Sequence, residues 1–318
     1  MRMQRFVLRP LTAFGSPLTG DTLFGQFCWA LRRACGEARL NELLEGYCDN
    51  RPFIVFSDAF PHGFAPLPTV PSFLRNDTDE GDRKHWKSKR WIALDHLGKD
   101  LAEWWPNACD DDHAYRKACA DPEAEQCRPC ARMQPHNTIN RLTGTTGKGS
   151  FAPYVRPQIW HHPETALDLY ALVDADRLPP SEVRDLLIAL GKSGYGSDAS
   201  AGLGKFDIQE NAPDWSRSTA RSFMTLAPCA PQGLGYDGTH SYYQIKTHFG
   251  RHGDMAALSQ PFKHPILLAK TGAVFSLPAA RAALFLGQGI GNTSRAQPRA
   301  VHQGYAPVVP LVGLRREA

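Results

Sequence analysis

Residues 4–36 read QRFVLRPLTAFGSPLTGDTLFGQFCWALRRACG, and this stretch predicts a strand, a turn and a helix. At its start, Phe6 and Leu8 alternate with arginines, which is the two-residue period of a strand. Residues 14–21 then form a connector rich in glycine, proline and small polar residues. We therefore expect the strand to end near Leu11, before the helix begins.

Apolar residues that recur every three or four positions indicate the helix. Asp21 is a suitable N-cap residue, and Gly36 is expected to end the helix. Between them, one face carries Leu23, Phe24, Phe27, Cys28 and Leu31. A second short helix over 40–46 and a strand over 53–56 follow, so the chain begins with a strand–helix–strand unit.

A second strand–helix–strand unit lies between residues 165 and 208. Its first strand covers 165–173, and its helix opens at Pro180 and closes at Gly191. Its second strand covers 206–208, and further strands are expected at 222–227, 241–248, 265–276 and 301–311. The two units predict an α+β fold with two ferredoxin-like domains, residues 1–160 and 161–318.

The composition is that of a globular protein and argues against several classes. The 318 residues include 27 glycines and 25 prolines, which argues against a helical bundle. No apolar run reaches the roughly 18 residues of a membrane helix, and the first residues lack the apolar core of a signal peptide. We therefore expect a cytoplasmic protein with no membrane partner. The formal net charge of +4 is too small to establish a nucleic-acid partner.

Four cysteines gather in an irregular insertion at about residues 62–135. Their spacing is C-x9-C-x7-C-x2-C, and they are Cys109, Cys119, Cys127 and Cys130. In a reducing compartment such thiols hold zinc more often than they form disulfides, so we expect a structural Zn²⁺. His113 could replace Cys109 as a ligand. The other four cysteines are scattered along the chain and are expected to be small packing residues.

The same insertion contains a basic and aromatic segment, RKHWKSKRW, at residues 83–91. Basic side chains can neutralise phosphates, and tryptophans can stack on bases. Alternatively, the segment is a solvated loop whose tryptophans pack against the rest of the protein. The sequence does not decide between these two interpretations.

A glycine-rich loop at residues 191–205 follows the second helix. Its five glycines allow a ligand to approach the backbone closely, and its N–H groups could hold phosphates. The loop lacks the P-loop pattern and follows a helix, which argues against a nucleotide hydrolase. The alternative is an ordinary turn between a helix and a strand.

Residues 132–154 are crowded with hydrogen-bonding side chains and have little apolar surface. Such a segment could form a hairpin that presents donors to phosphates, sugars and base edges, or it could be an ordinary polar loop. Motifs for hydrolysis are missing from the sequence. His136 is the best candidate for a general base, followed by His302 and His240.

Five segments together resemble a known family. They are FGSPLTGDTLFGQFCWALR (14–32), PFIVFSDAFP (52–61), PHNTINRLTGTTGKGSFAPY (135–154), GKSGYGSDASAGLGKF (191–206) and VHQGYAPVVPL (301–311). The chain resembles the fourth subunit of type III-A CRISPR Csm complexes, a Cas-five-like family of the RAMP superfamily. The resemblance covers nearly the whole chain, but it includes neither the cysteine cluster nor the basic segment.

This resemblance implies two ferredoxin-like (RRM-type) domains, a thumb-like hairpin and a non-catalytic role in a ribonucleoprotein. Members of the family bind the repeat-derived 5′ handle of the crRNA. They also contact the large Cas-ten-type subunit and the backbone RAMP subunits. We therefore expect the same partners for this chain.

Three groups of RNA-binding residues are carried over from the family's motifs. At the start of the first helix they are Ser16, Gly20, Asp21 and Thr22. In the hairpin they are His136, Asn137, Asn140, Arg141, Thr143 and Thr145. In the glycine loop they are Lys192, Ser193, Tyr195, Gly196 and Lys205, with Tyr195 expected to stack on a base.

Two other functions remain open at this point. One is a metal-independent endoribonuclease that processes repeat RNA, with His136 or a lysine as acid or base. The other is a zinc-stabilised module that binds proteins and does not contact RNA.

Overall fold

The first sheet of the protein contains both strand–helix–strand units. The computed structural model describes residues 1–75, 83–212, 218–252, 262–295 and 297–314. The sheet has the order β2-β7-β1-β8, and all of its neighbouring strands are antiparallel. These strands are β1 (Arg2–Pro10), β2 (Ile54–Pro61), β7 (Leu167–Val173) and β8 (Phe206–Asn211).

Two helices complete this unit, α1 (Gly20–Leu44) and α5 (Pro180–Ser193). In chain order the elements are β1-α1-β2-β7-α5-β8, which is one ferredoxin-like β-α-β-β-α-β arrangement. The expectation of one strand–helix–strand unit per domain is therefore wrong, because β7 pairs with both β1 and β2. The expected boundary at residue 160 falls between strands of a single sheet.

Two glycines determine where α1 starts and where it is interrupted. Gly36 has a φ of 86° and interrupts the helix where the sequence predicts its end, and a further helical segment reaches Leu44. At the other end, a Cβ on Gly20 would lie 2.3 Å from the carbonyl oxygen of Phe56, so only glycine allows the helix to start this close to β2. The N-cap residue is Thr19, not Asp21 as expected, and Asp21 lies inside the first turn.

A second sheet is built from the C-terminal part of the chain. Its order is β12-β9-β14-β13, and all of its pairs are antiparallel. The strands are β9 (Thr219–Thr225), β12 (Val274–Ala282), β13 (Phe285–Ile290) and β14 (His302–Leu311). Within the described part of residues 218–314 there is no helix, so a second ferredoxin-like domain is not confirmed. A separate ribbon pairs β10 (Ile245–His248) with β11 (Ile266–Ala269).

The two sheets are joined by hydrogen bonds between β2 and its surroundings. The side chain of Gln303 on β14 accepts a bond from Phe56 N (2.9 Å) and donates one to Phe56 O (2.8 Å). Asp58 N donates to the carbonyl oxygen of Leu226 at 2.8 Å. Because these bonds lie within a buried region, they fix the relative position of the sheets.

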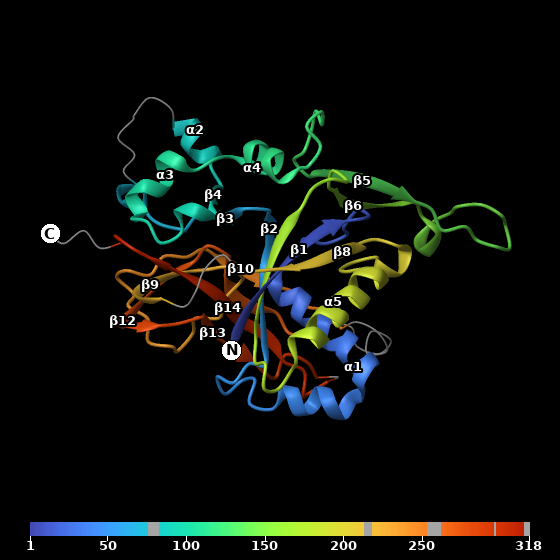
Figure 1. The fold of residues 1–318 in the computed structure, drawn as a ribbon. Coiled ribbons are helices and arrows are strands. Elements are labelled where there is room, and N and C mark those ends of the chain that lie inside the picture. Colours follow the sequence, from blue (N-terminus) through green and yellow to red (C-terminus); the bar gives the residue numbers. More distant parts are fainter. Residues whose placement is uncertain (76–82, 213–217, 253–261, 296, 315–318) are drawn as a thin grey trace.

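The insertion between β2 and the hairpin shares a hydrophobic cluster with both sheets. Its elements are β3 (Phe64–Pro66), α2 (Arg83–Ser88), β4 (Trp91–Ala93), α3 (Trp104–Asn107) and α4 (Asp111–Ala118), with 3-10 turns at Ser72–Leu74, Leu94–His96 and Leu101–Glu103. Trp104 and Trp105 are buried, and their cluster includes Met224 and Val309 of the second sheet. The insertion thus packs against the body, above the second sheet in Figure 1.

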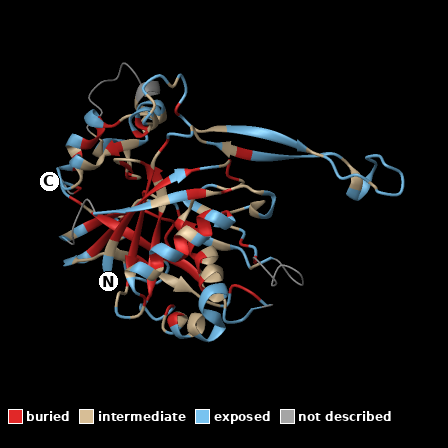
Figure 2. Cartoon of the chain, turned by 45° about the vertical axis from the view of Figure 1, so that its right-hand side comes forward, coloured by how far each residue is buried: buried red, intermediate tan, exposed pale blue. Residues whose placement is uncertain are grey.

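A long hairpin projects from the body, as the resemblance implies. It pairs β5 (Cys130–His136) with β6 (Tyr154–Trp160), and short 3-10 turns occur at Gly149–Phe151 in the hairpin and Ala199–Ala201 in the glycine loop. Figure 2 shows the hairpin reaching far from the body, and most of its residues are exposed. None of the helices that the structure describes is long and apolar enough to span a membrane.

Candidate nucleic-acid interface

A groove of about 1120 Å³ runs between the two halves of the protein. Its walls come from α1, the glycine loop, β10 with the residues after it, and residues 297–302. Among the described lining residues, the lysines and arginines are Arg32, Arg156, Lys246, Arg251, Lys263 and Arg299, and the carboxylates are Asp21, Glu37 and Asp198.

Each of the three carboxylates in the groove pairs with one of these cations. Arg32 lies 2.7 Å from Glu37, Lys246 lies 3.4 Å from Asp21, and Arg156 is paired with Asp198. Among the described lining residues, three cations remain without a carboxylate partner in the groove: Arg251, Lys263 and Arg299. Burial lowers the pKa of Lys263. A groove with this surplus suits a polyanion.

The glycine loop and the turn before α1 meet at the edge of this groove, as the resemblance implies. Ser197 N donates to Ser16 Oγ at 3.1 Å, and Gly196 N donates to Gln26 Oε1 at 3.1 Å. Gly196 has a φ of 81°, and a Cβ there would lie 3.0 Å from the Ser16 side chain. The close contact therefore depends on glycine at this position.

The start of α1 uses its N–H groups within the protein. Gly20 N donates to Asp58 Oδ1 at 2.8 Å, and Thr22 N donates to Asp21 Oδ1 at 2.8 Å. These two N–H groups are therefore not available to a phosphate, although helix N-termini often bind anions. Burial raises the pKa of Asp58 to about 7; the Thr271 hydrogen bond opposes this effect, and the charge of Asp21 adds to it.

Tyr195 does not stack on a ligand, and that expectation is wrong. The residue is 0% exposed. Its hydroxyl donates to the carbonyl oxygen of Pro17 at 2.8 Å and accepts from Thr19 N at 3.1 Å. Tyr195 therefore anchors the glycine loop to the connector that precedes α1.

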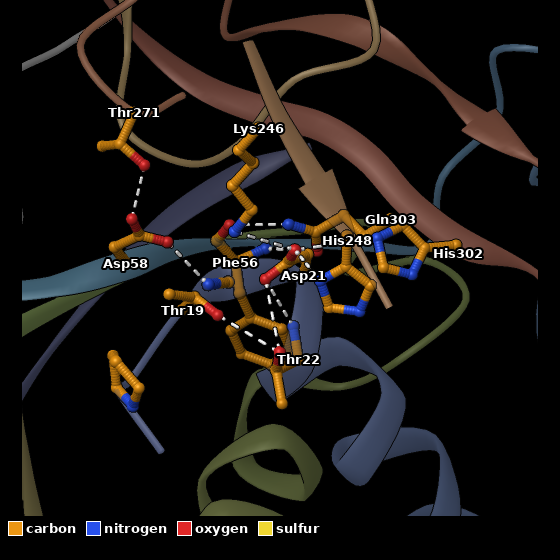
Figure 3. Close-up of polar contacts among 12 residues, drawn as sticks. Thr19, Asp21, Thr22, Phe56, Asp58, Lys246, His248, Thr271, His302 and Gln303 are labelled. Atoms are coloured by element: carbon orange, nitrogen blue, oxygen red, sulfur yellow. Dashed lines mark hydrogen bonds and ion pairs between the residues drawn. The ribbon is translucent and has the colours of Figure 1, made fainter. Parts of the chain in front are cut away.

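Asp21 lies at the centre of a buried cluster in the groove wall (Figure 3). Its Oδ2 atom lies 3.1 Å from His248 Nδ1, 3.4 Å from Lys246 Nζ and 3.7 Å from His302 Nε2. Burial alone would raise the pKa of Asp21, but the contacts with both histidines and the charge of Lys246 hold it well below its usual value. Burial lowers the pKa of His302, although the charge of Asp21 opposes this effect. Asp21 thus joins α1 to β10 and β14.

The ligand atoms of Asp21, His248 and His302 are close enough to one another to hold a metal ion. The ammonium group of Lys246 lies 3.4 Å from the same carboxylate oxygen and already compensates its charge. The positive end of the α1 dipole is nearby and also disfavours a cation. The arrangement therefore fits an internal ion-pair cluster better than a metal site.

Other residues expected at the interface lie outside the groove. Lys192, Ser193 and Lys205 do not line it, although Lys192 and Ser193 are exposed. Ser193 Oγ donates to the carbonyl oxygen of Leu190, within α5. The glycine loop therefore contributes Gly196, Ser197 and Asp198 to the groove instead of its lysines.

The hairpin residues form a separate surface that meets the groove only at its base. None of the six expected residues lines the groove: His136, Asn137, Asn140, Arg141, Thr143 and Thr145. Asn140 stabilises the turn at the tip of the hairpin, residues 140–145. Its backbone N donates to Thr145 O (3.0 Å) and its Oδ1 accepts from Leu142 N (2.9 Å). His136 is stacked on Tyr154 with the ring centroids 5.3 Å apart. Arg156 on β6 is the hairpin residue that reaches the groove.

The four cysteines of the insertion do not form a set of metal ligands among the described residues. The Cys119 and Cys127 thiols interact, and Cys119 Sγ lies 3.3 Å from His162 Nδ1. Cys109 is placed elsewhere, where its backbone pairs with Trp91. His113 lies in α4, where its backbone N donates to Asp110. The zinc site stays a prediction, with His162 as a neighbour that the sequence did not indicate.

The tryptophans of the basic segment pack against the protein. Trp86 and Trp91 lie against the core of the insertion, and Trp91 Nε1 donates to Asp111 Oδ1 at 2.7 Å. Lys89 Nζ donates to the carbonyl oxygen of Trp105 at 2.8 Å and lies 4.1 Å from the centre of the Trp86 ring. The side chains of residues 83–85 lie outside the described part. This packing favours the second interpretation of the segment.

Comparison with solved structures identifies the fold of this chain. No protein-family model and no curated protein matches its sequence. One match is a chain of the Csm3-Csm4 subcomplex in the type III-A CRISPR-Cas interference complex. The two chains are 14% identical, the match covers 97% of this chain and 99% of that chain, and the TM-score is 0.61. Another is a chain of the Csm1-Csm4 cassette in complex with cA4, with 14% identity, 98% of each chain covered and a TM-score of 0.55. The subunit common to both complexes is Csm4.

The chain has a Csm4-like fold. The resemblance to the fourth subunit, inferred from five sequence segments, is thus confirmed in the structure. The match covers both sheets, the insertion and the hairpin, because it extends over nearly the full length of the chain.

Proposed function

We propose that this chain is the Csm4-like subunit of a type III CRISPR effector complex and that it binds the 5′ handle of the crRNA. The observation that carries the proposal is the positively charged groove, at whose edge the turn before α1 meets the glycine loop. A single-stranded RNA is the polyanion expected in such a groove. The Csm4-like fold supports the assignment to an effector complex.

The proposed role divides the molecule into two RNA-contacting parts. The groove would hold the handle, with the surplus cations Arg251, Lys263 and Arg299 facing its phosphates. The hairpin would contact nucleotides beyond the groove through its exposed tip, where Leu142 is 96% exposed and Arg141 is also exposed. Arg156 at the base of the hairpin would connect the two parts.

The proposed partners are a Csm1-like large subunit, of the Cas-ten type, and Csm3-like backbone RAMP subunits. The support comes from the structural relatives, which are a Csm3-Csm4 subcomplex and a Csm1-Csm4 cassette. The chain would bridge these partners and have no catalytic role of its own.

Metal-independent cleavage of repeat RNA is the second candidate function. The observation in its favour is that His248 and His302 face each other in the groove with ring centroids 4.7 Å apart. Both side chains, however, are directed at the carboxylate of Asp21, and His302 is only 5% exposed. Of the three histidines that the sequence suggested, His136 and His240 do not line the groove. These contacts support binding over catalysis.

Purification from cells that co-express the neighbouring genes and a repeat array tests the proposal. The expected result is bound RNAs that share one defined, repeat-derived 5′ end, together with co-purifying large and backbone subunits. Absent RNA, or RNA with random 5′ ends, would contradict it. Incubating the purified chain with repeat RNA tests the second candidate, and cleavage that is lost in His302→Ala would favour the endoribonuclease.

A further inference from the structure

One aromatic side chain in the groove is largely exposed, and no ring or guanidinium group packs on it among the described residues. Phe249 lines the groove and is 72% exposed. An exposed phenylalanine leaves apolar area in water without any compensation within the chain. It shares the groove with basic residues, and these indicate the kind of molecule that would cover it.

The local structure holds Phe249 in place. In β10, Lys246 and His248 turn towards Asp21, so the ribbon is tied to α1 at alternate positions. Phe249 follows His248 directly, past the end of β10, and lines the groove.

The Phe249 ring is largely exposed within the described structure. Among the described residues, neither a second ring nor a guanidinium group packs on it. By contrast, the Arg32 guanidinium lies 5.2 Å from the centre of the Trp29 ring, and that of Arg251 lies 4.6 Å from the centre of the Phe262 ring. The Phe249 ring, unlike that of Trp29, is therefore free of a guanidinium group among the described residues.

Charge decides which ligand fits this ring. The surplus cations Arg251, Lys263 and Arg299 line the same groove. Exposed aromatic rings between cations are the usual platform for single-stranded nucleic acid, because a base stacks on the ring while phosphates lie against the cations. An apolar protein surface would have to bury this surplus charge, which is costly.

We infer that Phe249 is a stacking platform for one nucleobase of a single-stranded RNA bound in the groove. This inference rests on the proposed function and adds to it a specific contact. Because stacking tolerates any base, Phe249 would contribute affinity without selecting a sequence.

The test compares Phe249→Ala, Phe249→Trp and the control Phe73→Ala. Phe73 is exposed to a similar extent, 70%, but it does not line the groove. The probe is a fluorescein-labelled single-stranded RNA of repeat sequence, titrated with the full-length chain and followed by fluorescence anisotropy. Phe249→Ala is expected to weaken binding about 5- to 150-fold, whereas Phe249→Trp and Phe73→Ala keep the wild-type affinity. The salt dependence of binding is expected to stay unchanged, since no charge is removed.

A second readout locates the stacked base directly. RNAs that carry 2-aminopurine at one position after another are mixed with the wild type, and one position is expected to lose fluorescence on binding. That loss should disappear in Phe249→Ala. Equal affinity of Phe249→Ala and wild type would overturn the inference alone and would leave the ring as a protein-docking residue. Failure of the wild type to bind RNA would overturn both the inference and the proposed function.

Discussion

The carboxylate of Asp21 in the first turn of α1 lies against the imidazole of His248 of β10, with 3.1 Å between Oδ2 and Nδ1. This contact ties the helix of the first sheet to a ribbon of the C-terminal part. Asp21 is 2% exposed, so the pair lies in a region of low dielectric constant, where its interaction is strong. Lys246 and His302 contact the same carboxylate (Figure 3), so these contacts hold the walls of the groove together.

Replacing Asp21 with asparagine is expected to lower the free energy of unfolding by about 1.5–3 kcal/mol, since it removes charged hydrogen-bonding contacts. Urea unfolding at pH 7 measures this change. Asp207→Asn, at an exposed position of β8, is the matched control and should leave stability unchanged. Because the pKa of Asp21 is held low in the folded state, its stabilisation is complete above about pH 4 and is lost at lower pH. The wild type should therefore lose stability in acid more steeply than Asp21→Asn, and equal slopes would contradict the ion pair.

Replacing Asp58 with asparagine is expected to have the opposite pH dependence. Burial raises the pKa of Asp58 from 3.8 to about 7, so the folded state favours the neutral acid, and stability is lost as the pH rises through this range. Asparagine is neutral and can still accept from Gly20 N. Asp58→Asn should therefore gain stability relative to the wild type as the pH rises from 4 to 8. Thermal unfolding across this range checks the trend, and a constant difference would argue against a raised pKa.

Neutralising the surplus cations of the groove is expected to change the salt dependence of RNA binding. Arg251→Gln and Arg299→Gln should each reduce the slope of log affinity against log salt by about 0.7, the value for one phosphate contact on a single strand. Arg184→Gln is the control, since Arg184 lies on α5 outside the groove. If all three variants keep the wild-type slope, the groove is not the RNA site.

The double variant Asn140→Ala with Arg141→Ala is expected to weaken binding of the crRNA handle. Because Asn140 also holds the tip turn, the double variant removes both a charge and the shape of the tip. Arg141→Ala alone should retain the turn and lose only the charge contact. Unchanged affinity in the double variant would remove the hairpin from the RNA-binding surface.

Zinc analysis of the purified chain is expected to find one zinc per chain, which Cys119→Ser or Cys127→Ser should abolish. Cys109→Ser is expected to retain the metal, because the structure places Cys109 apart from the interacting thiols. Cys48→Ser, at an exposed position outside the insertion, controls for a general effect of cysteine loss. Much less than one zinc per chain in the wild type would rule out the structural site.

The sequence predicted the elements whose signals are local. Periodicity located α1 and α5, and Gly36 marked the interruption of α1 because its φ of 86° suits glycine. The hairpin was also expected, since a polar segment of that length has little to bury. Strand β13 was missed, because its sequence, FLGQGI, contains two glycines and shows no clear alternation.

The parts that depend on long-range pairing were not predictable in this way. Nothing in the sequence of β7 indicates that it lies between β1 and β2, so the two units were assigned to different domains. The same holds for Asp21, whose partners on β10 and β14 are far away in the chain. The burial of Tyr195 was not predictable either, because a tyrosine in a glycine loop can face solvent or the interior with the same local sequence.

The order of strands in the first sheet also governs when the protein can fold during synthesis. Strand β1 pairs with β7 and β8, and both of these follow the insertion and the hairpin in the chain. A ribosome-bound chain that ends at residue 160 therefore has a central strand with neither of its neighbours, and its apolar residues Phe6 and Leu8 stay uncovered. Such non-local pairing slows folding and exposes strands to aggregation. Strand β1 is thus made before both of its partners and is completed only after Asn211 has left the ribosome. Chaperones or partner subunits would have the most effect during this delay.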